Sequence, residues 1–548
     1  MARRIVVIGS DTRSFLSVIR SFGRNGSEVD VVPLQDHDSA LRSKYIRRVH
    51  RIGLPQRRKM EWAGELAALV NAHRYDLVVP VDDRSIIPVD EFRSMFRGKT
   101  ALAIPSTDMI ETVNSKGAMR ELARSVDVPV SAGMLAEDAE QIRLIAQEVG
   151  LPCVLKPVSS YSRAQVNSKQ YVRKAFTQQD LEALLSGEFK DKPAVIERNF
   201  IGVGVGVTVL CRDGNVLAAM QHQRLHEPLH GGGSSYRKTT PLSDDLLGYT
   251  SKLMTVVGYT GVAMVEFKRN LDTGEAIFIE VNGRFAGSLP LCLAAKFDLP
   301  TWYGDMLLDG RSDFPTAYLI GRYARAISSE ARWFKHNLRA DKSDKTLATV
   351  PVYKTLLEPL RFFAGAETLD SMPLDDLQPG KDELSQLVRE RVLYRRYQRP
   401  PVRRDKRLPT GSRVLVVCKG NICRSPFAEK VLSNLRSDLT VESAGYYPVD
   451  GRPSPPAAVQ AASDFGVDLT HHRSKKLTDN MLASAHAVIV FDREHFVELA
   501  LYHPAAISKV FALGATYIED PFGKSFDEFV ECYREIAELC GALAETLR

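Results

Sequence analysis

A cysteine stands at the start of a loop near the end of the chain, between a strand and a helix. Residues 414–417 are an apolar run typical of a buried strand, and residues 426–435 have the pattern of a helix. The loop between them reads Cys418-Lys419-Gly420-Asn421-Ile422-Cys423-Arg424-Ser425. Such a loop turns backbone N–H groups inward above a helix N-terminus, which predicts an anion-binding cradle.

The residue types in this loop fit phosphate chemistry. The N–H donors and the positive helix end favour the thiolate of Cys418, which is the nucleophilic form. Arg424 can offer a planar pair of donors to a phosphate, and Ser425 can donate a hydrogen bond to the thiolate. These parts suit attack on phosphorus through a phosphocysteine. Asp520, before Pro521, is either the acid for the leaving oxygen or a simple turn aspartate.

Residues 411–548 resemble the low-molecular-weight protein tyrosine phosphatases. The resemblance lies in the loop with its flanking strand, in Ser443-Ala444-Gly445 and in Asp520-Pro521 followed by an aromatic residue. It implies that Cys418 is the nucleophile, that Arg424 binds phosphate and that Asp520 is the general acid. The other loop residues would shape the phosphate site, and Cys423 would be able to trap oxidised Cys418 as a disulfide.

Two features of this region leave alternatives open. Val490-Phe491-Asp492 stands where the family usually has Met-Asp, which we interpret as a difference in packing. Arsenate reduction, a related use of the fold, usually needs a further redox cysteine after the loop. Cys532 and Cys540 fall in an expected final helix, which argues against that role. An inactive phosphatase is a further alternative.

A second group of polar residues lies in the middle of the chain. Glu266 belongs to a strand-like run at 261–268, and Glu280 and Asn282 belong to another at 276–284, after a turn. The two runs predict an antiparallel hairpin. Glu280 and Asn282 would share a face that Glu266 could reach. These oxygen donors suit magnesium bridging nucleotide phosphates. The alternative is a set of charges on a surface strand.

Residues 1–310 resemble the ATP-grasp superfamily, whose members join a carboxylate to an amine or another nucleophile through an acyl phosphate. The resemblance implies that Lys116 and Lys156 bind the nucleotide and that Glu197 is the hinge glutamate, with Phe200 close by. It also implies ATP and Mg²⁺ as cofactors, with Mn²⁺ as an alternative ion. The implied metal ligands and phosphate-binding arginine are Glu266, Glu280, Asn282 and Arg284.

Three segments depart from this pattern or are ambiguous. Residues 159–163, Ser-Ser-Tyr-Ser-Arg, stand where family members commonly have a glycine-rich flap. Residues 230–236 form either a mobile acceptor-side loop or a flexible connection. Gly202, Gly204 and Gly206 alternate with valine, which we interpret as a turn and the start of a strand rather than a phosphate loop.

The order of strand-like and helix-like segments that would position these residues predicts a multi-domain α/β fold. Strands and helices alternate over residues 1–105, which predicts a doubly wound, Rossmann-like lobe with a parallel sheet. Its first turn lacks the spaced glycines of a dinucleotide site. Two ATP-grasp lobes of α+β type would follow at 106–310, then a helical extension at 311–388 with Leu360, Phe362 and Phe363 in its core. The phosphatase domain, again a doubly wound parallel sheet, would occupy 411–548.

Composition narrows the class of protein. The 548 residues are 44% hydrophobic and 26% charged, as in ordinary globular proteins. No apolar run has the length of a membrane span, so we expect a cytoplasmic protein. The seven cysteines form neither a disulfide framework nor a zinc-site spacing. Residues 389–413 hold ten Lys or Arg against two acidic residues. We interpret 389–410 as a solvated linker; the alternative is a nucleic-acid or membrane tether.

The two groups of residues together predict a bifunctional enzyme. One part would be an ATP- and magnesium-dependent ligase acting on a small carboxylate and a nucleophile, either an amine or a thiol. The other would be a cysteine-dependent phosphatase acting on a phosphorylated protein or small molecule, and nucleic acid is not an expected partner. The alternative function is a phosphatase regulated by a non-catalytic, ATP-sensing module.

Overall fold

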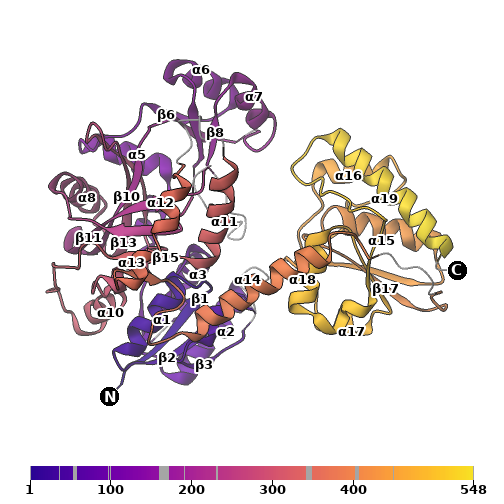
Figure 1. Cartoon of the computed structure of the whole chain (residues 1–548), viewed down its shortest axis with the longest axis horizontal. Coiled ribbons are helices and arrows are strands. Elements are labelled where there is room, and N and C mark those ends of the chain that lie inside the picture. Colours follow the sequence, from indigo (N-terminus) through magenta and orange to yellow (C-terminus); the bar gives the residue numbers. More distant parts are fainter. Residues whose placement is uncertain are drawn as a thin grey trace. The chain divides into compact units, whose positions relative to one another are not determined.

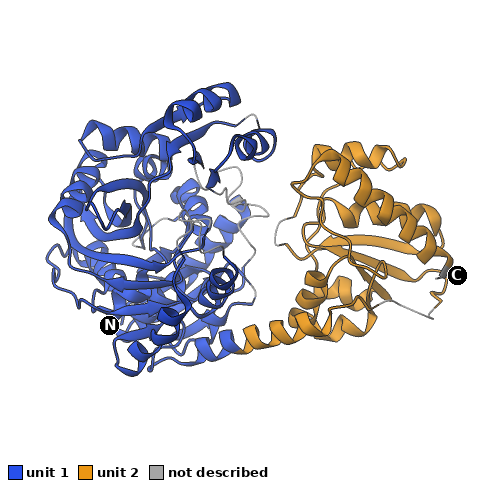
Figure 2. Cartoon of the chain, turned by 45° about the horizontal axis from the view of Figure 1, so that its top comes forward, with its two compact units in different colours: residues 1–384 blue, residues 385–548 orange. Residues whose placement is uncertain are grey.

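The structure, a computed structural model, divides the chain into two compact units, residues 1–384 and residues 385–548 (Figure 2). Both units combine sheets with helices, and the expected multi-domain α/β class is confirmed. No helix in the described part of the chain is long and apolar enough to cross a membrane. The structure describes residues 2–35, 37–52, 59–96, 98, 100–158, 172–190, 192–229, 232–340, 349–401, 407–447 and 450–546.

Unit 1 begins with a five-stranded parallel sheet in the order β3-β2-β1-β4-β5 (Figure 1). The predicted alternation of strands and helices is present. One face packs against α1 and against α9 and α10 from later in the chain, and α2 and α3 cover the other. This packing brings the β1–α1 connection close to residues near 287. The bounds are β1 (Arg4–Gly9), α1 (Ser14–Arg24), β2 (Glu28–Pro33), β3 (Ile46–Val49), α2 (Lys59–His73), β4 (Leu77–Pro80), α3 (Asp83–Glu91), β5 (Ala101–Leu102), α9 (Leu289–Ala294) and α10 (Leu299–Asp309).

A small antiparallel sheet, in the order β6-β9-β7-β8, follows in unit 1. Lys156 lies on β7 and Glu197 on the neighbouring strand β9. Before this sheet, residues 107–125 form two helices separated at Ser115, whose side chain accepts a hydrogen bond from the Ala118 N–H and caps the second helix. The bounds are α4 (Thr107–Asn114), α5 (Lys116–Ser125), β6 (Gly133–Ala136), α6 (Ala139–Val149), β7 (Cys153–Pro157), β8 (Arg173–Ala175), α7 (Gln178–Ser186) and β9 (Ala194–Arg198).

A seven-stranded sheet in the order β14-β13-β10-β11-β12-β15-β16 forms the body of unit 1. The predicted hairpin is confirmed, because β13 and β14 are antiparallel with Glu266 opposite Glu280. Gly206 on β10 pairs with Glu266 on one side and with His222 on the other. Glu280, Glu266, Gly206 and His222 therefore form one row across the sheet. The bounds are β10 (Val203–Arg212), β11 (Asn215–His226), β12 (Tyr236–Thr239), α8 (Asp244–Val257), β13 (Gly261–Arg269), β14 (Ala276–Asn282), β15 (Tyr323–Arg325) and β16 (Glu367–Leu369).

The segment after residue 310 differs from the expected helical extension. Strand β15 precedes the helices α11 (Ile327–Arg339), α12 (Val352–Leu357) and α13 (Leu360–Phe363), strand β16 follows them, and both strands add to the sheet. The predicted core residues Leu360, Phe362 and Phe363 are wrong, since they are 62%, 43% and 83% exposed. The inward side of α13 is instead Arg361, whose guanidinium lies over the ring of Tyr323 at 4.6 Å. A cationic contact therefore fixes this helix to the sheet.

Unit 2 contains a four-stranded parallel sheet in the order β18-β17-β19-β20. Helices α15, α16 and α19 pack on one face, and α17 and α18 pack on the other (Figure 1). The strand expected at 414–417 is β17, which ends at Cys418. The bounds are α14 (Gln378–Arg396), β17 (Arg413–Cys418), α15 (Arg424–Leu435), β18 (Thr440–Gly445), α16 (Pro456–Ser463), α17 (Asp479–Ser484), β19 (Ala487–Val490), α18 (Arg493–Tyr502), β20 (Val510–Ala512) and α19 (Phe526–Thr546).

The segment interpreted as a solvated linker, 389–410, belongs to unit 2, and part of it packs into the core of that unit. Helix α14 continues to Arg396, and Tyr397 is buried with its ring stacked on Phe496 at 5.0 Å. Leu408 is also buried. The interpretation is therefore wrong for Tyr397 and Leu408, because their apolar side chains pack into the unit 2 core despite the basic residues around them. Residues 402–406 lie outside the described part.

This packing predicts where unit 2 can be cut. A fragment of residues 385–548 should fold and keep its activity, whereas a fragment of 411–548 should be less stable. Losing a buried aromatic side chain costs roughly 3 kcal/mol, so the difference should be easily measured by denaturant unfolding. A Tyr397→Ala variant of the longer fragment is the matched control and should lose a comparable amount. Equal stability of the two fragments would contradict the assignment of Tyr397 to this core.

Candidate functional site

The cysteine loop of unit 2 surrounds the sulfur of Cys418 with donors. The Asn421 N–H donates to Cys418 Sγ at 3.2 Å, and the Ser425 hydroxyl lies 3.0 Å from the same sulfur. Cys418 ends β17, and Arg424 and Ser425 begin α15. The loop thus places a nearly buried sulfur at the N-terminus of a helix, where an anion is stabilised.

Asn421 holds the shape of this loop. Its φ of 50° lies in the left-handed region, which is unfavourable for a residue with a side chain. Its amide donates to Ser425 Oγ and Ser443 Oγ, and its Oδ1 accepts the Lys475 N–H. Its carbonyl lies 2.7 Å from His472 Nε2. These contacts hold the strained backbone in place.

Arg424 is almost fully buried and is held by two acids. Its Nη1 donates to Asp492 Oδ2 and to the Ile518 carbonyl, each at 2.8 Å, and its Nη2 lies 2.9 Å from Asp520 Oδ2. The Phe491 ring lies 5.6 Å from the guanidinium. The interpretation of residues 490–492 as packing alone is therefore wrong, because Asp492 directly aims the arginine. Its position just after a buried strand was the signal that could have revealed it.

The remaining loop residues have different surroundings. Lys419 is exposed and pairs with Glu494, and the Gly420 carbonyl accepts a hydrogen bond from Arg452. Ile422 and Cys423 are buried. Cys418 and Cys423 are both free thiols, and burial raises the pKa of Cys423 far above its ordinary value. Cys423 is accordingly a thiol rather than a thiolate at neutral pH.

Asp520 lies at the mouth of the loop, with its side chain 42% exposed beside Arg424. Phe522, two residues later, is 59% exposed. If Asp520 protonates the leaving oxygen, Asp520→Asn should lower kcat by about 10²-fold or more for alkyl phosphates. The loss should be much smaller for p-nitrophenyl phosphate, whose phenolate leaves without a proton. Steady-state rates over a series of leaving groups measure this, and an equal loss for all of them would exclude Asp520 as the acid.

Unit 1 has a cavity of about 530 Å³ that brings its expected site residues together. They reach it from α5, from the small sheet and from the seven-stranded sheet. All eight line the cavity: Lys116, Lys156, Glu197, Phe200, Glu266, Glu280, Asn282 and Arg284. Residues 159–163 and 230–231 lie outside the described part, so their expected roles remain predictions.

Three charges meet in this cavity around Glu197. Glu197 is buried. It accepts a hydrogen bond from Arg120 and forms an ion pair with Lys156. Lys156 is itself buried, and no carboxylate other than that of Glu197 is paired with it in the described residues. Because Lys156 shares this one carboxylate with Arg120, it is a candidate to bind an anionic ligand in the cavity. Arg120 was not expected at this site.

Glu266 and Glu280 lie side by side and repel each other. Arg224 binds Glu266 through two hydrogen bonds of 2.6 and 2.5 Å, and Lys116 lies 3.4 Å from Glu280. Burial raises the pKa of Glu266 in spite of Arg224, and the Glu280 charge adds to this. Burial acts in the same direction on Glu280, but Lys116 and a hydrogen bond from Asn282 outweigh it and lower the pKa of Glu280 to about 2.

The donor set of this group fits a divalent cation. Each carboxylate oxygen has a lone pair beyond those used by Arg224 and Lys116. A cation between Glu266 and Glu280 would offset their repulsion, and carboxylate and amide oxygens are the ligands that Mg²⁺ prefers. Arg284 donates to Asn282 Oδ1 at 3.2 Å and to Asp83 at 2.8 Å, so it lies beside the same group.

The glycines of β10 make room for side chains over this site. A Cβ at Gly206 would lie 2.3 Å from His222 Cε1, and one at Gly204 would lie 2.7 Å from Arg224 Cδ. Gly202 lies in a bend directly before β10, and Gly204 and Gly206 are near the start of that strand, so the interpretation of a turn and strand start is confirmed. The absent side chains of Gly204 and Gly206 allow His222 and Arg224 to lie over the sheet. Burial, followed by the charges of Arg224 and Arg237, lowers the pKa of His222 to about 3, so the ring is neutral.

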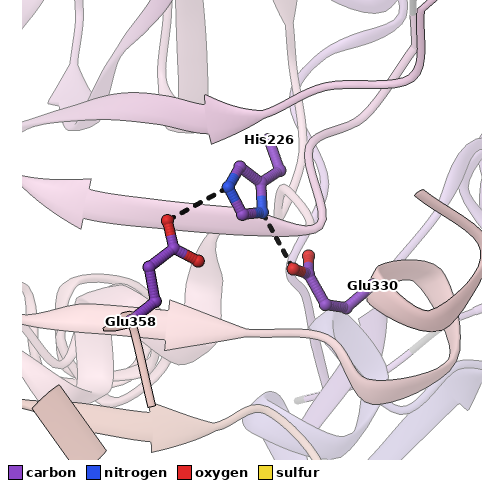
Figure 3. A group of neighbouring side chains, drawn as sticks. All are labelled: His226, Glu330 and Glu358. Carbon is purple, nitrogen blue, oxygen red and sulfur yellow. Dashed lines mark hydrogen bonds and ion pairs between the residues drawn. The ribbon is translucent and has the colours of Figure 1, made fainter. Parts of the chain in front are cut away.

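A third group of polar residues surrounds His226 (Figure 3). Its Nδ1 lies 2.8 Å from Glu330 and its Nε2 lies 3.2 Å from Glu358. Arg325 pairs with both of these glutamates, and the His226 ring stacks on Trp333 at 3.5 Å. Since both ring nitrogens and both carboxylates already have partners, we interpret the group as an ion-pair network that attaches the segment after residue 310 to β11.

This network predicts a pH-dependent stability of unit 1. Burial favours the neutral ring, but the hydrogen bonds that the ring donates to Glu330 and Glu358 outweigh it and raise the pKa of His226 above its ordinary value. The stabilisation should be complete below pH 6.5 and should fade as the pH rises through the folded-state pKa. Thermal unfolding of the chain and of His226→Gln should therefore differ most at pH 5.5 and least at pH 9. A difference that does not change with pH would contradict the protonated pair.

Known proteins resemble the two ends of the chain separately. The family model "Low molecular weight phosphotyrosine protein phosphatase" matches residues 413–548. The "Probable low molecular weight protein-tyrosine-phosphatase EpsP" of Ralstonia nicotianae is 36% identical over 126 residues, which are 22% of this chain and 87% of that protein. The structure of Vibrio vulnificus Wzb in complex with benzylphosphonate is 34% identical, with a TM-score of 0.24, over 25% of this chain and 98% of that one.

The N-terminal part of the chain resembles a different kind of structure. The biotin carboxylase domain of Hydrogenobacter thermophilus 2-oxoglutarate carboxylase, in complex with MgADP, ADP and bicarbonate, is 16% identical with a TM-score of 0.47. The match covers 59% of this chain and 73% of that one. Because identity and TM-score are low, the functional proposals for unit 1 rest on the residues of its own cavity.

Proposed function

The chain belongs, through residues 413–548, to the low molecular weight phosphotyrosine protein phosphatase family, and on this premise we propose that unit 2 hydrolyses phosphate monoesters. Cys418 Sγ attacks phosphorus, and the P–O bond to the leaving group breaks as the S–P bond forms. Asp520 gives a proton to the leaving oxygen. Water then releases inorganic phosphate from the phosphocysteine, with Asp520 now taking the proton.

The contacts of Cys418 and Arg424 carry this proposal. The loop N–H and the Ser425 hydroxyl face the sulfur, and Arg424 is fixed by Asp492 beside Asp520. An arginine held in one orientation can bind two phosphate oxygens without losing side-chain entropy at that moment. The exposed Phe522 beside Asp520 supports an aryl ester, such as phosphotyrosine, as the substrate.

For unit 1, we propose an ATP-dependent ligase that activates a carboxylate as an acyl phosphate. The observation that carries it is the convergence of Lys116, Lys156 and the Glu266–Glu280–Asn282 group on one cavity. The lysines would bind the phosphates of ATP, and Glu266, Glu280 and Asn282 would hold Mg²⁺. When bound, the ion offsets the charge of the transferring phosphoryl group. Arg284 lies beside these ligands and would bind the same phosphates.

The alternative, an ATP sensor without turnover, is favoured by one observation. Arg224 already binds Glu266 through both carboxylate oxygens, so this ligand would have to be shared with the metal ion. Both functions predict ATP binding, and they differ in whether ATP is consumed.

One experiment separates them. The full chain is incubated with ATP and Mg²⁺ and a panel of amino acids and small carboxylic acids, each with an amine or thiol, and ADP release and product mass are measured. A ligase should release ADP only with its own acid and should yield a condensed product. ATP binding without ADP release across the panel would overturn the ligase proposal and support the sensor. The same samples, assayed with p-nitrophenyl phosphate, test the phosphatase proposal independently.

A further inference from the structure

Two arginines converge at one end of the unit 1 cavity. Arg13, from the connection between β1 and α1, and Arg237, on β12, both line it. Both donate to the carbonyl oxygen of Ser234, at 3.2 and 3.3 Å. Arg237 is neutralised by Asp370, which accepts two hydrogen bonds of 2.6 and 2.5 Å from it. The charge of Arg237 is therefore compensated within the fold.

The charge of Arg13 is not compensated in the same way. Within the part of the chain that the structure describes, the Arg13 guanidinium donates to the Ser234 carbonyl, and no carboxylate forms an ion pair with it. The nearest acid in sequence, Asp11, accepts instead from the Arg13 and Phe15 N–H groups and the Ser14 hydroxyl, at the start of α1. Burial, followed by the charge of Arg237, lowers the pKa of Arg13, and the charges of Asp11 and Asp370 do not outweigh these two effects.

His222 gives a second, independent indication of a ligand. It is 1% exposed, it lines the same cavity, and its Nδ1 has no hydrogen-bond partner among the described residues. A buried, unpaired polar atom is costly, and such atoms commonly mark a place that a ligand or water fills. Gly206 is what leaves space for this ring.

The chain around Arg13 leaves room for its guanidinium. A Cβ at Gly287 would lie 2.9 Å from Arg13 Cζ, so a larger residue here would displace the guanidinium from its present position. Gly287 follows Arg284 by three residues. Arg13 is thus brought from the first lobe to the connection that leaves the proposed phosphate site, because α1 packs on α9 and α10.

We propose that Arg13, in the cavity that His222 also lines, binds a substrate carboxylate that is not the one phosphorylated, so that one substrate of unit 1 is a dicarboxylic acid or an amino acid. This proposal rests on the ligase function proposed above. In that function, ATP, its metal ion and the reacting carboxylate are bound by Lys116, Lys156, Arg284 and the metal ligands. Arg13 adds one positive charge that no ion pair holds in the described residues, which matches a carboxylate monoanion better than a phosphate dianion.

Binding of simple probes to the full chain tests the site directly. Succinate, its diamide and inorganic phosphate are titrated by calorimetry, with and without Mg²⁺ and a non-hydrolysable ATP analogue. We expect succinate to bind more tightly than succinamide and phosphate, and Arg13→Gln to weaken succinate binding about tenfold or more. Arg24→Gln, at the other end of the helix that follows Arg13 and paired with Asp375, is the matched control and should not change it.

Three results would overturn the proposal: unchanged succinate binding in Arg13→Gln, equal binding of succinamide, or tighter binding of phosphate. Where the acid screen finds turnover, Arg13→Gln should raise KM for the carboxylate substrate with kcat nearly unchanged, because a group that does not react is bound equally in the ground and transition states. A fall in kcat alone would place Arg13 in the chemistry instead. If the unaltered chain does not bind the ATP analogue, the ligase proposal fails. If the unaltered chain binds succinate and Arg13→Gln does not, the carboxylate site is supported.

Discussion

Cys418→Ser is expected to abolish the hydrolysis of aryl phosphates by the full chain, with a loss of about 10⁴-fold or more. The serine hydroxyl is barely ionised at neutral pH, even where the Asn421 N–H and the helix N-terminus would stabilise an anion. Release of p-nitrophenol measures the rate. The variant should still bind vanadate or phosphate, because Arg424 and the loop N–H groups are unchanged.

Cys423→Ser is the matched control for this change. Cys423 has the same chemistry and lies five residues away, but it is buried and its raised pKa keeps it protonated. Its replacement should leave the rate within a few-fold, apart from a cost in stability. Substantial activity in Cys418→Ser, or an equal loss in Cys423→Ser, would contradict the assignment of the nucleophile.

The cysteine loop could be predicted from the sequence because its chemistry is local. Eight consecutive residues contain the nucleophile, the phosphate-binding arginine and the residue that shapes the loop, and the flanking strand and helix follow from short-range patterns. Asp492 was missed as a partner of Arg424, since its role depends on β17 and β19 lying side by side. Pairing between segments that are distant in the sequence cannot be predicted from either segment alone.

The cavity of unit 1 shows the same division. The family pattern could be recognised from the order of Lys116, Lys156, Glu197 and the hairpin acids along the chain. In the structure, all of them line one cavity. Arg13 and His222 were not found, because one comes from a lobe expected to lack a nucleotide site and the other points over a glycine on the neighbouring strand. Alternating glycines opposite bulky polar residues on the next strand are the signal that could have identified His222.

Errors in the segment from 311 to 410 have a common physical cause. Hydrophobic residues were expected inside and basic residues outside, yet Phe363 is exposed while Arg361 lies on aromatic rings. Tyr397 is buried although the residues around it are basic, because its ring stacks on Phe496. Short helices have too few residues for an apolar periodicity to determine which side faces inward.

Glu280→Gln is expected to eliminate magnesium-dependent ATP turnover by unit 1 while leaving the phosphatase rate of unit 2 unchanged. The glutamine keeps the size of the side chain and can still accept the hydrogen bond from Asn282. It removes the charge that pairs with Lys116 and one of the two carboxylates available to the ion. Since such an ion supplies several kcal/mol of transition-state stabilisation, the loss should be about a thousandfold or more.

Two measurements and a control make this change decisive. ADP release is followed with the acid found in the screen, and Mg²⁺-dependent ATP binding is followed by calorimetry, which needs no acceptor. Glu275→Gln, an exposed acid in the turn of the same hairpin, should change neither. Retained Mg²⁺-dependent ATP binding and turnover in Glu280→Gln would remove Glu280 from the metal site. A parallel fall of both enzyme activities in a folded variant would contradict the separation of the two sites, because Glu280 and Cys418 lie in different compact units, each with its own core.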